Sequence, residues 1–199
     1  MSNQLPETVW RSGIHIYLRP IMETDIPQFQ YWVNDVVNAR FINITQPMSI
    51  LAEQEWYKRT ADGDPNKISA AICLQNGTLI GTIGMTIDTD NQSAVTGTLI
   101  GPHQCKGKGY ATEAKMLILD YAFNWRGLRK VTSKILALND RSQKYAARCG
   151  YRWMATIEQE HFRDGKWVDE LLYVVFADKW RPLWEQYCDA PEEFFTRRP

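Results

Sequence analysis

Cysteine is scarce in this sequence, and its four copies lie far apart. Cys73, Cys105, Cys149 and Cys188 form no C-x-x-C pair, which argues against a zinc site or a disulfide framework. We therefore expect reduced thiols, no metal and a cytoplasmic location.

Long apolar runs and an excess of charge are also missing. No apolar run reaches the roughly 18 residues of a membrane span, and the polar N-terminus lacks the apolar core of a secretory signal. The 23 basic and 23 acidic residues cancel, so no overall charge would attract nucleic acid or an anionic membrane. We expect neither partner.

What the sequence does contain is apolar and aromatic residues, enough for a sizeable core. Hydrophobic residues make up 44% of the chain, including eight tryptophans, which argues against disorder. The length of 199 residues suits one domain. We expect a single domain over 1–199, with its core at about 14–176 and a C-terminal helix and tail at 178–199.

The spacing of apolar residues predicts an α+β fold. Strands are expected at 14–18, 67–74, 78–87, 93–100, 131–138, 151–162 and 168–176. Helices are expected after the caps Thr24 and Ser49, over 110–126 and 140–148, and from 178, with a loose segment from 191. The order predicts a mixed, mostly antiparallel, twisted sheet of about seven strands flanked by about four to five helices. The unit 93–138 supplies its parallel, right-handed part.

The segment Q-C-K-G-K-G-Y-A, residues 104–111, follows a predicted strand and opens a predicted helix. Gly107 and Gly109 permit a tight turn and close approach of a ligand. The free N–H groups and dipole of a helix start favour an anion, so the segment reads either as a pyrophosphate cradle or as a tight turn with solvated lysines. The P-loop spacing is absent, and Thr112 stands where a dinucleotide fingerprint needs glycine.

These residues resemble a known family. Q-C-K-G-K-G-Y-A fits the coenzyme A motif Gln/Arg-x-x-Gly-x-Gly/Ala of the GNAT acetyltransferases. The following A-T-E-A and N-D-R-S-Q-K-Y-A-A-R-C-G-Y resemble the Rim-type branch, which includes the acetyltransferases of ribosomal-protein N-termini. Leu18-Arg19-Pro20, Thr24-Asp25 and D-G-K-W-V-D-E add to the likeness, which covers about 14–176.

The resemblance implies a GNAT-type fold and acetyl-CoA as cosubstrate, with coenzyme A as product. Backbone N–H groups from Lys106 to Ala111 would hold the pyrophosphate. The residues expected to contact the coenzyme are Leu99, Ile100, Gln104, Cys105, Lys106, Gly107, Lys108, Gly109, Tyr110, Ala111, Asn139 and Ser142. Leu99 and Ile100 would pair with the pantetheine arm as an added strand would. Asn139 would hydrogen-bond the pantetheine, although it also suits an ordinary helix N-cap.

The proton donor and the base are harder to assign. Many GNAT enzymes use a tyrosine as the acid for the leaving thiolate, but Ala146 stands at that position, and Tyr145 is expected to point into packing. Ser142 matches the serine proposed for this role in the Rim-type branch. His103 is a candidate base, since imidazole titrates near neutrality, although it also reads as a loop residue; a water-mediated base is a further alternative.

The acceptor side is expected around the loop 40–47 and the last hairpin. Candidate residues there are Trp32, Trp56, Glu158, Glu160, His161, Asp169 and Glu170. Tryptophans in such positions more often belong to the core, and the charges also suit a solvated hairpin.

The sequence therefore predicts an acetyl-CoA-dependent N-acetyltransferase that uses direct attack by a primary amine in a ternary complex. The acceptor is a protein N-terminus or a small-molecule amine; polyamine, aminoglycoside or amino-sugar acceptors are alternatives. A non-catalytic acetyl-CoA sensor is the alternative of another class, and a monomer and a homodimer both remain open.

Overall fold

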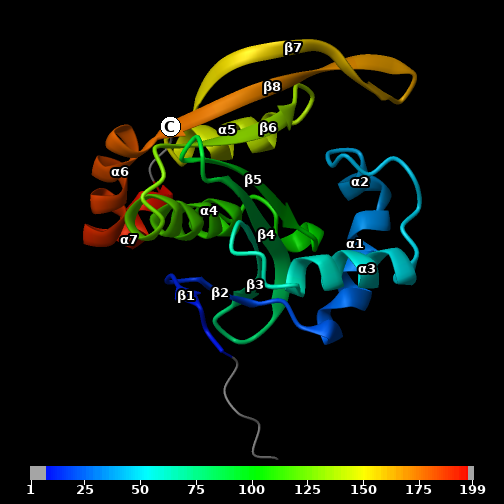
Figure 1. The fold of residues 1–199 in the computed structure, drawn as a ribbon, viewed down its shortest axis with the longest axis horizontal. Coiled ribbons are helices and arrows are strands. Elements are labelled where there is room, and N and C mark those ends of the chain that lie inside the picture. Colours follow the sequence, from blue (N-terminus) through cyan, green and yellow to red (C-terminus); the bar gives the residue numbers. More distant parts are fainter. Residues whose placement is uncertain (1–7, 197–199) are drawn as a thin grey trace, which may run out of the picture.

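A computed structural model describes residues 8–196, which form an eight-stranded sheet in the order β1-β2-β3-β4-β5-β6-β8-β7 (Figure 1). The strands are β1 (Arg11–Ser12), β2 (Ile16–Pro20), β3 (Lys67–Leu74), β4 (Leu79–Asp88), β5 (Ser93–Ile100), β6 (Lys130–Leu136), β7 (Arg152–Arg163) and β8 (Lys166–Phe176). The strand β1, which was not predicted, pairs antiparallel with β2 and raises the count above seven.

The helices flank both faces of this sheet. They are α1 (Ile26–Asn34), α2 (Val36–Ala39), α3 (Ile50–Ala61), α4 (Tyr110–Asp120), α5 (Asp140–Arg148), α6 (Ala177–Asp189) and α7 (Pro191–Thr196). Short turns of other types are η1 (Glu23–Asp25), η2 (His103–Cys105) and the π-helical η3 (Tyr121–Trp125). Among the described residues no helix is both long and apolar enough to cross a bilayer. The mixed α+β architecture confirms the predicted fold class.

The pairing of β5 with β6 sets the position of the site. All neighbouring strands run antiparallel except these two, which are parallel and pair only from Ser93–Val95 to Lys130–Thr132. Both strands continue beyond these pairs, β5 against β4 and β6 against β8. The predicted parallel unit is thus confirmed, and β5 and β6 separate after a short paired stretch.

Alternating residues of the sheet supply two cores, as the period of a strand requires. On β2, Ile16 and Leu18 join the larger core with α4, whereas Tyr17 joins the smaller core with Phe29 and Trp32 of α1. Figure 1 shows α4, α6 and α7 on one side of the central strands and α1–α3 on the other. The two helical groups therefore cover opposite faces.

The first helix begins differently from the prediction. Thr24 lies within η1 and is not the cap of α1; the residue before α1 is Asp25, with Pro27 in the first turn. Asp25 is buried and forms a two-pronged ion pair with Arg19, at 2.7 and 2.8 Å. Because this ion pair holds Asp25 in the turn directly before α1, Thr24 lies inside η1 and does not cap the helix. The predicted cap Ser49 is confirmed, since its hydroxyl accepts from the backbone N–H of Ala52 at 3.1 Å.

The C-terminal region packs against the body of the protein. Trp180 is fully buried and stacks on Trp184, and Tyr187 contacts Phe194 at 5.5 Å between ring centroids. The expectation of a loose segment from Pro191 is therefore wrong for 191–196, which form α7, because Phe194 anchors it to α6. Residues 197–199 lie outside the described range.

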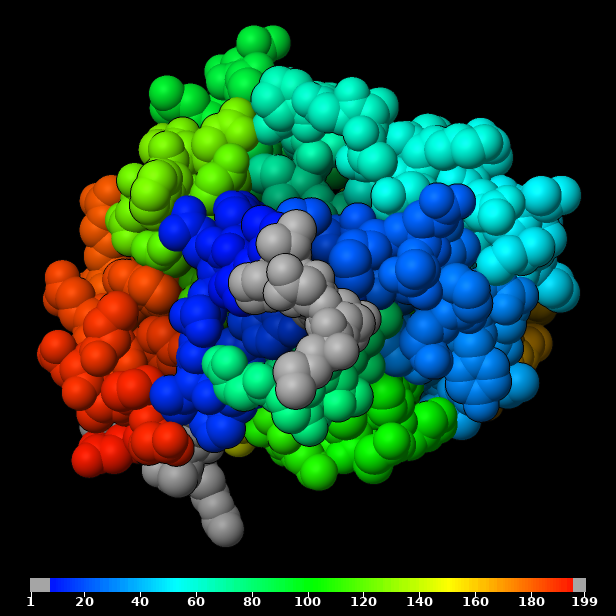
Figure 2. All heavy atoms as spheres, turned by 90° about the horizontal axis from the view of Figure 1, so that it is seen from below, coloured from blue at the N-terminus to red at the C-terminus, as the bar shows by residue number. Residues whose placement is uncertain are grey.

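A buried glutamate joins this C-terminal region to the N-terminal strands. Glu113 of α4 accepts hydrogen bonds from the backbone N–H of Ile14 at 2.5 Å and from the Tyr187 hydroxyl at 3.1 Å. Seen from below, the C-terminal helices lie beside the first strands, with α1–α3 on the far side of those strands (Figure 2). Glu113 of α4 thus links the segment before β2 to α6, although these parts are distant in sequence.

Candidate active site

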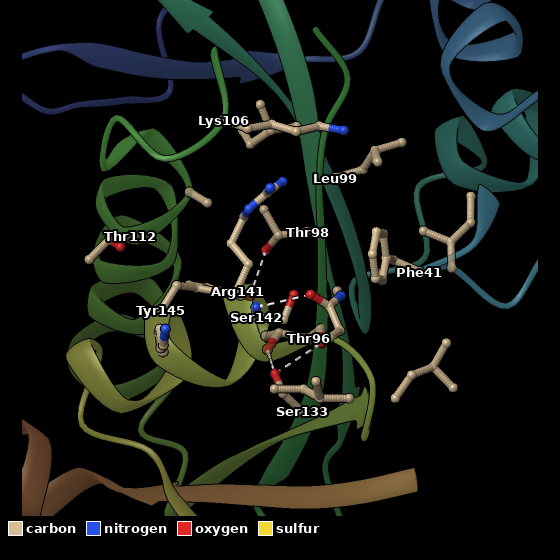
Figure 3. Close-up of a pocket in the computed structure, with 18 of the residues that line it drawn as sticks. Phe41, Thr96, Thr98, Leu99, Lys106, Thr112, Ser133, Arg141, Ser142 and Tyr145 are labelled. Carbon is tan, nitrogen blue, oxygen red and sulfur yellow. Dashed lines mark hydrogen bonds between the residues drawn. The ribbon is translucent and has the colours of Figure 1, made fainter. Parts of the chain in front are cut away.

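The separation of β5 from β6 opens a cavity of about 480 Å³. One wall is the stretch 96–100 of β5 and the other is 133–136 of β6. Residues of the loop 105–112 and of α5 complete the lining, and Phe41 faces them from the opposite side (Figure 3). The cavity therefore runs from the start of α4, between the two strands, toward the segment after α2.

The glycine loop closes one end of this cavity. Gly107 and Gly109 have φ values of 79° and 88°, a region that favours glycine, and a Cβ added at Gly107 would meet no atom within 4 Å. The first helical hydrogen bond of α4 is donated by Glu113 to the Gly109 carbonyl. The N–H groups of the first turn therefore have no partner within the helix, and the space beside Gly107 is open.

The loop residues predicted to bind coenzyme fall into two groups. Leu99, Ile100, Cys105, Lys106, Gly107, Gly109, Tyr110 and Ala111 line the cavity. Gln104 and Lys108 are exposed and lie outside this lining. The backbone N–H of Lys106 already donates to the His103 carbonyl at 3.1 Å, so it is not free to donate to a ligand.

Lys106 contributes its side chain at the rim. Its ammonium donates to the Asn38 carboxamide oxygen, and Asn38 in turn donates to the carbonyls of Trp32 and Gly101. Burial, with some contribution from nearby Arg141, lowers the pKa of Lys106. The lysine thus connects the cradle to α2 across the cavity mouth.

Three cations of α5 lie along the same cavity and were not predicted as site residues. Arg141, Lys144 and Arg148 recur at intervals of three and four, which places them on one helix face. That spacing is visible in the sequence and is the signal that could have found them. Together with Lys106 they make the cradle end of the cavity electropositive.

Asn139 and Ser142 occupy the first turn of α5. The Asn139 side-chain oxygen accepts from the backbone N–H of Ser142 at 3.1 Å, so Asn139 is the helix N-cap. Both residues also line the cavity. The capping role and a role toward a ligand are therefore compatible in space.

Tyr145 packs against the larger core, as expected, and it also faces the cavity. Its ring lines the cavity, and its hydroxyl donates to the Thr98 hydroxyl of β5 at 3.4 Å. Burial of the phenol raises its pKa. Tyr145 meets the cavity as well as the core because α5 lies against the open stretch of β5.

The far end of the cavity is organised around Glu170 of β8. This carboxylate is 2% exposed, and it contacts Lys134 at 2.9 Å and His161 at 3.0 Å. Burial opposes its charge, but the hydrogen bonds from Lys134 and His161 outweigh burial and hold the pKa of Glu170 below its ordinary value. Glu170 is the one carboxylate among the described residues that line the cavity.

Other candidates from the sequence lie elsewhere. Trp32 is 3% exposed, in the smaller core, and Trp56 packs against that core. Glu158 and Glu160 are exposed beside a bulge of β7, where the Asp169 carboxylate accepts from the backbone N–H of Gln159 at 2.9 Å. None of these five residues belongs to the cavity lining.

His103 also lies outside that lining. Its side chain is 53% exposed, and its Nε2 lies 3.1 Å from the Asp35 carboxylate. The contact ties η2 to the start of α2 at the cavity mouth.

Comparison with known proteins gives the class of this site. The acetyltransferase (GNAT) domain family matches residues 15–152, well over half of the chain. The chain therefore belongs to the GNAT acetyltransferase family, and it is an N-acetyltransferase that uses acetyl-CoA.

Individual relatives are distant. A curated protein, the uncharacterized N-acetyltransferase p20 of Bacillus licheniformis, is 24% identical over 172 residues, covering 84% of this chain and 94% of that protein. The spermidine N-acetyltransferase of Vibrio cholerae, solved with CoA and spermine, is 20% identical with a TM-score of 0.78, over 84% of this chain and 98% of that chain. Mycobacterium smegmatis RimJ, solved with CoA-disulfide, is 18% identical with a TM-score of 0.77, over 88% and 89%. These similarities establish the fold.

Proposed function

We propose that this protein transfers the acetyl group of acetyl-CoA to a single primary amine, by direct attack in the cavity between β5 and β6. The observation that carries the proposal is the early separation of these parallel strands directly beside the glycine loop. A cradle for phosphates and a slot for an extended arm therefore adjoin each other. Holding both reactants there makes the reaction effectively intramolecular, which favours direct transfer.

The cradle end fits coenzyme A. The open bend at Gly107 and the first-turn N–H groups of α4 suit a diphosphate. Arg141, Lys144 and Arg148 would neutralise further phosphate charge, and the edge of β5 at Leu99 and Ile100 would pair with the pantetheine arm. When bound, acetyl-CoA supplies the acetyl group as a thioester.

Two side chains reach the cavity as candidates for the proton donor to sulfur. Ser142 lies in the first turn of α5, fixed by the Asn139 cap, whereas the Tyr145 hydroxyl already donates to Thr98. We assign the donor role to Ser142. Because Leu99 and Ile100 would pair with the pantetheine arm, a backbone N–H nearer Thr96 on β5 would stabilise negative charge on the carbonyl oxygen.

Glu170 is the residue best placed to receive the acceptor. It is buried, charged and located on the cavity wall opposite the cradle. It would hold the amine and accept its proton, directly or through water. The position of His103 outside the lining favours Glu170 over His103 as the base.

The charges of the cavity favour a monoamine over a polyamine. Among residues 8–196 the lining contains five cations and one carboxylate, and Lys134 already contacts that carboxylate. A polycation would need several carboxylates to compensate its charge. We therefore propose a protein N-terminus or a small monoamine as acceptor, handled in the cytoplasm by a monomer or homodimer without nucleic acid.

Two aspartate-sized variants test the cradle. Gly107→Asp and Gly107→Asn have the same shape and tolerate positive φ, but only aspartate adds a negative charge. Titration calorimetry should show a loss of coenzyme A affinity of about 10²–10³-fold for Gly107→Asp relative to Gly107→Asn, from charge repulsion at about 4 Å. Equal affinities for the two variants would refute the cradle.

Release of coenzyme A thiol over a panel of amines tests the reaction. Turnover with N-terminal peptides or monoamines, and little with spermidine, is the expected outcome. Tight coenzyme binding without thiol release on any amine would instead favour the non-catalytic sensor.

A further inference from the structure

Lys115 is a buried lysine directly behind the cavity. It lies in the second turn of α4 and is 1% exposed. Its ammonium donates to the Thr96 hydroxyl at 2.6 Å and to the Ser133 hydroxyl at 3.4 Å. One charged group thus reaches both strands that form the cavity walls.

The two hydroxyls lie where the strands begin to separate. The last parallel pair is Val95 with Thr132, and Thr96 and Ser133 are the next residue on each strand. Their hydroxyl oxygens are 3.0 Å apart, the Ser133 hydroxyl donates to the Thr96 carbonyl at 3.2 Å, and both residues line the cavity (Figure 3). Lys115 therefore lies at the closed end of the cavity, separated from it by these two side chains.

The groups that face Lys115 from other elements carry no charge to balance it. Its ammonium lies 5.7 Å from the Tyr145 ring and 5.6 Å from the Tyr151 ring, and Cys149 lies nearby. Burial raises the pKa of both phenols and raises that of Cys149 to about 12, so all three are neutral near pH 7. Among the residues described, no carboxylate forms an ion pair with Lys115.

A buried cation without an anion is costly, because burial removes its hydration. Burial accordingly lowers the pKa of Lys115 to about 8. Hydroxyls and ring faces compensate this loss in part. An apolar side chain would fill the same space without that cost, so the position is explained best by an anion that forms in the adjoining cavity.

We propose that Lys115 is a positioning residue for transfer, which acts through the Thr96 hydroxyl to stabilise negative charge on the coenzyme A sulfur. The inference rests on the proposed function, because it needs the thioester to lie between β5 and β6. In the transfer the acceptor nitrogen forms the new C–N bond and releases a proton. The C–S bond breaks with its electron pair on sulfur, which takes up a proton before product leaves.

The binary complex with coenzyme A provides a test that needs no acceptor. Ultraviolet absorbance of the thiolate reports the pH at which the bound thiol ionises. We expect this thiol to titrate about one to three pH units lower in the natural protein than in Lys115→Met, since a nearby opposite charge favours the ionised form. The same titration in both proteins would overturn the proposal.

A second pair of variants keeps the test decisive if Lys115→Met does not fold. Thr96→Val preserves shape but removes the hydroxyl, whereas Thr96→Ser retains it. We expect Thr96→Val to shift the thiol titration toward that of free coenzyme A, and Thr96→Ser to restore the natural value. Indistinguishable titrations for this pair would exclude the relay through Thr96.

Two further measurements separate the possible failures. Calorimetry with coenzyme A shows whether the binary complex forms; its absence in the natural protein would refute the proposed function, whereas binding without a shifted thiol refutes only this inference. Without ligand, stability of the natural protein relative to Lys115→Met should rise as pH increases from about 8 toward the ordinary lysine pKa. The unfolded chain binds the extra proton over that interval.

Discussion

The two ends of the cavity are built from different kinds of chemistry. At the cradle end, one contiguous loop presents backbone N–H groups, and the cations around it are largely exposed. At the acceptor end, a buried carboxylate of β8 meets side chains from β6 and β7. We infer that the first end tolerates the removal of any one side chain, whereas the second depends on each of its side chains.

Glu170→Gln should have the largest effect in this comparison. The change removes the cavity carboxylate while keeping its shape, so we expect kcat/KM for the amine to fall about 10²–10³-fold, within the range of a lost general base. Coenzyme affinity should remain unchanged. Steady-state kinetics and calorimetry on the same preparation check both statements.

A matched control is available on the neighbouring strand. Glu158→Gln alters an exposed carboxylate outside the cavity lining, and we expect it to leave kcat/KM within about twofold, as for most surface changes. A larger loss for Glu158→Gln than for Glu170→Gln would transfer the acceptor role to the hairpin bulge. Because the pKa of Glu170 is held below its ordinary value, its contribution should persist as pH falls through the usual glutamate range.

The same contrast explains what the sequence could predict. The sequence could predict the cradle because Gly107, Gly109 and the following helix are neighbours along the chain, and local geometry determines their role. The parallel unit could be derived from a strand, a helix and a second strand in succession. Seven of the eight strands were predicted; β1 was missed because two residues give no periodic signal.

At the acceptor end the sequence named Glu170 and His161 among several candidates but could not single them out. Glu170 becomes important because β8 places it opposite Leu136, and a bulge in β7 brings His161 to the same carboxylate. A register of this kind depends on pairing between distant segments, which a single sequence does not specify. The burial of Lys115 could not be predicted for a similar reason. In the sequence it is one polar position of an amphipathic helix, and only the pairing of two distant strands encloses it.

Substitutions in α5, between the two ends of the cavity, should have the next largest effect on turnover. Ser142→Ala should lower kcat about 10- to 100-fold with little change in coenzyme affinity, as expected when a hydrogen bond to a charged group is lost. Tyr145→Phe should change kcat only slightly, because its hydroxyl already donates to Thr98. Single-turnover kinetics of both variants distinguish them, and the reverse order of losses would assign the donor role to Tyr145.

The smallest effects should come from the exposed cations of α5. Arg141→Met, Lys144→Met and Arg148→Met each remove one charge that points along the cradle end. Since each interaction is partly screened, we expect each variant to weaken coenzyme A binding by no more than about fivefold, the range of an exposed ion pair. The losses should shrink as salt is raised, because screening already weakens exposed charges. Lys179→Met on α6, an exposed lysine outside the cavity lining, serves as the control and should bind normally. If one of the α5 variants loses coenzyme A affinity as severely as Gly107→Asp, then a side chain holds the coenzyme at that end. In that case the contrast between a backbone cradle and a side-chain acceptor site does not hold.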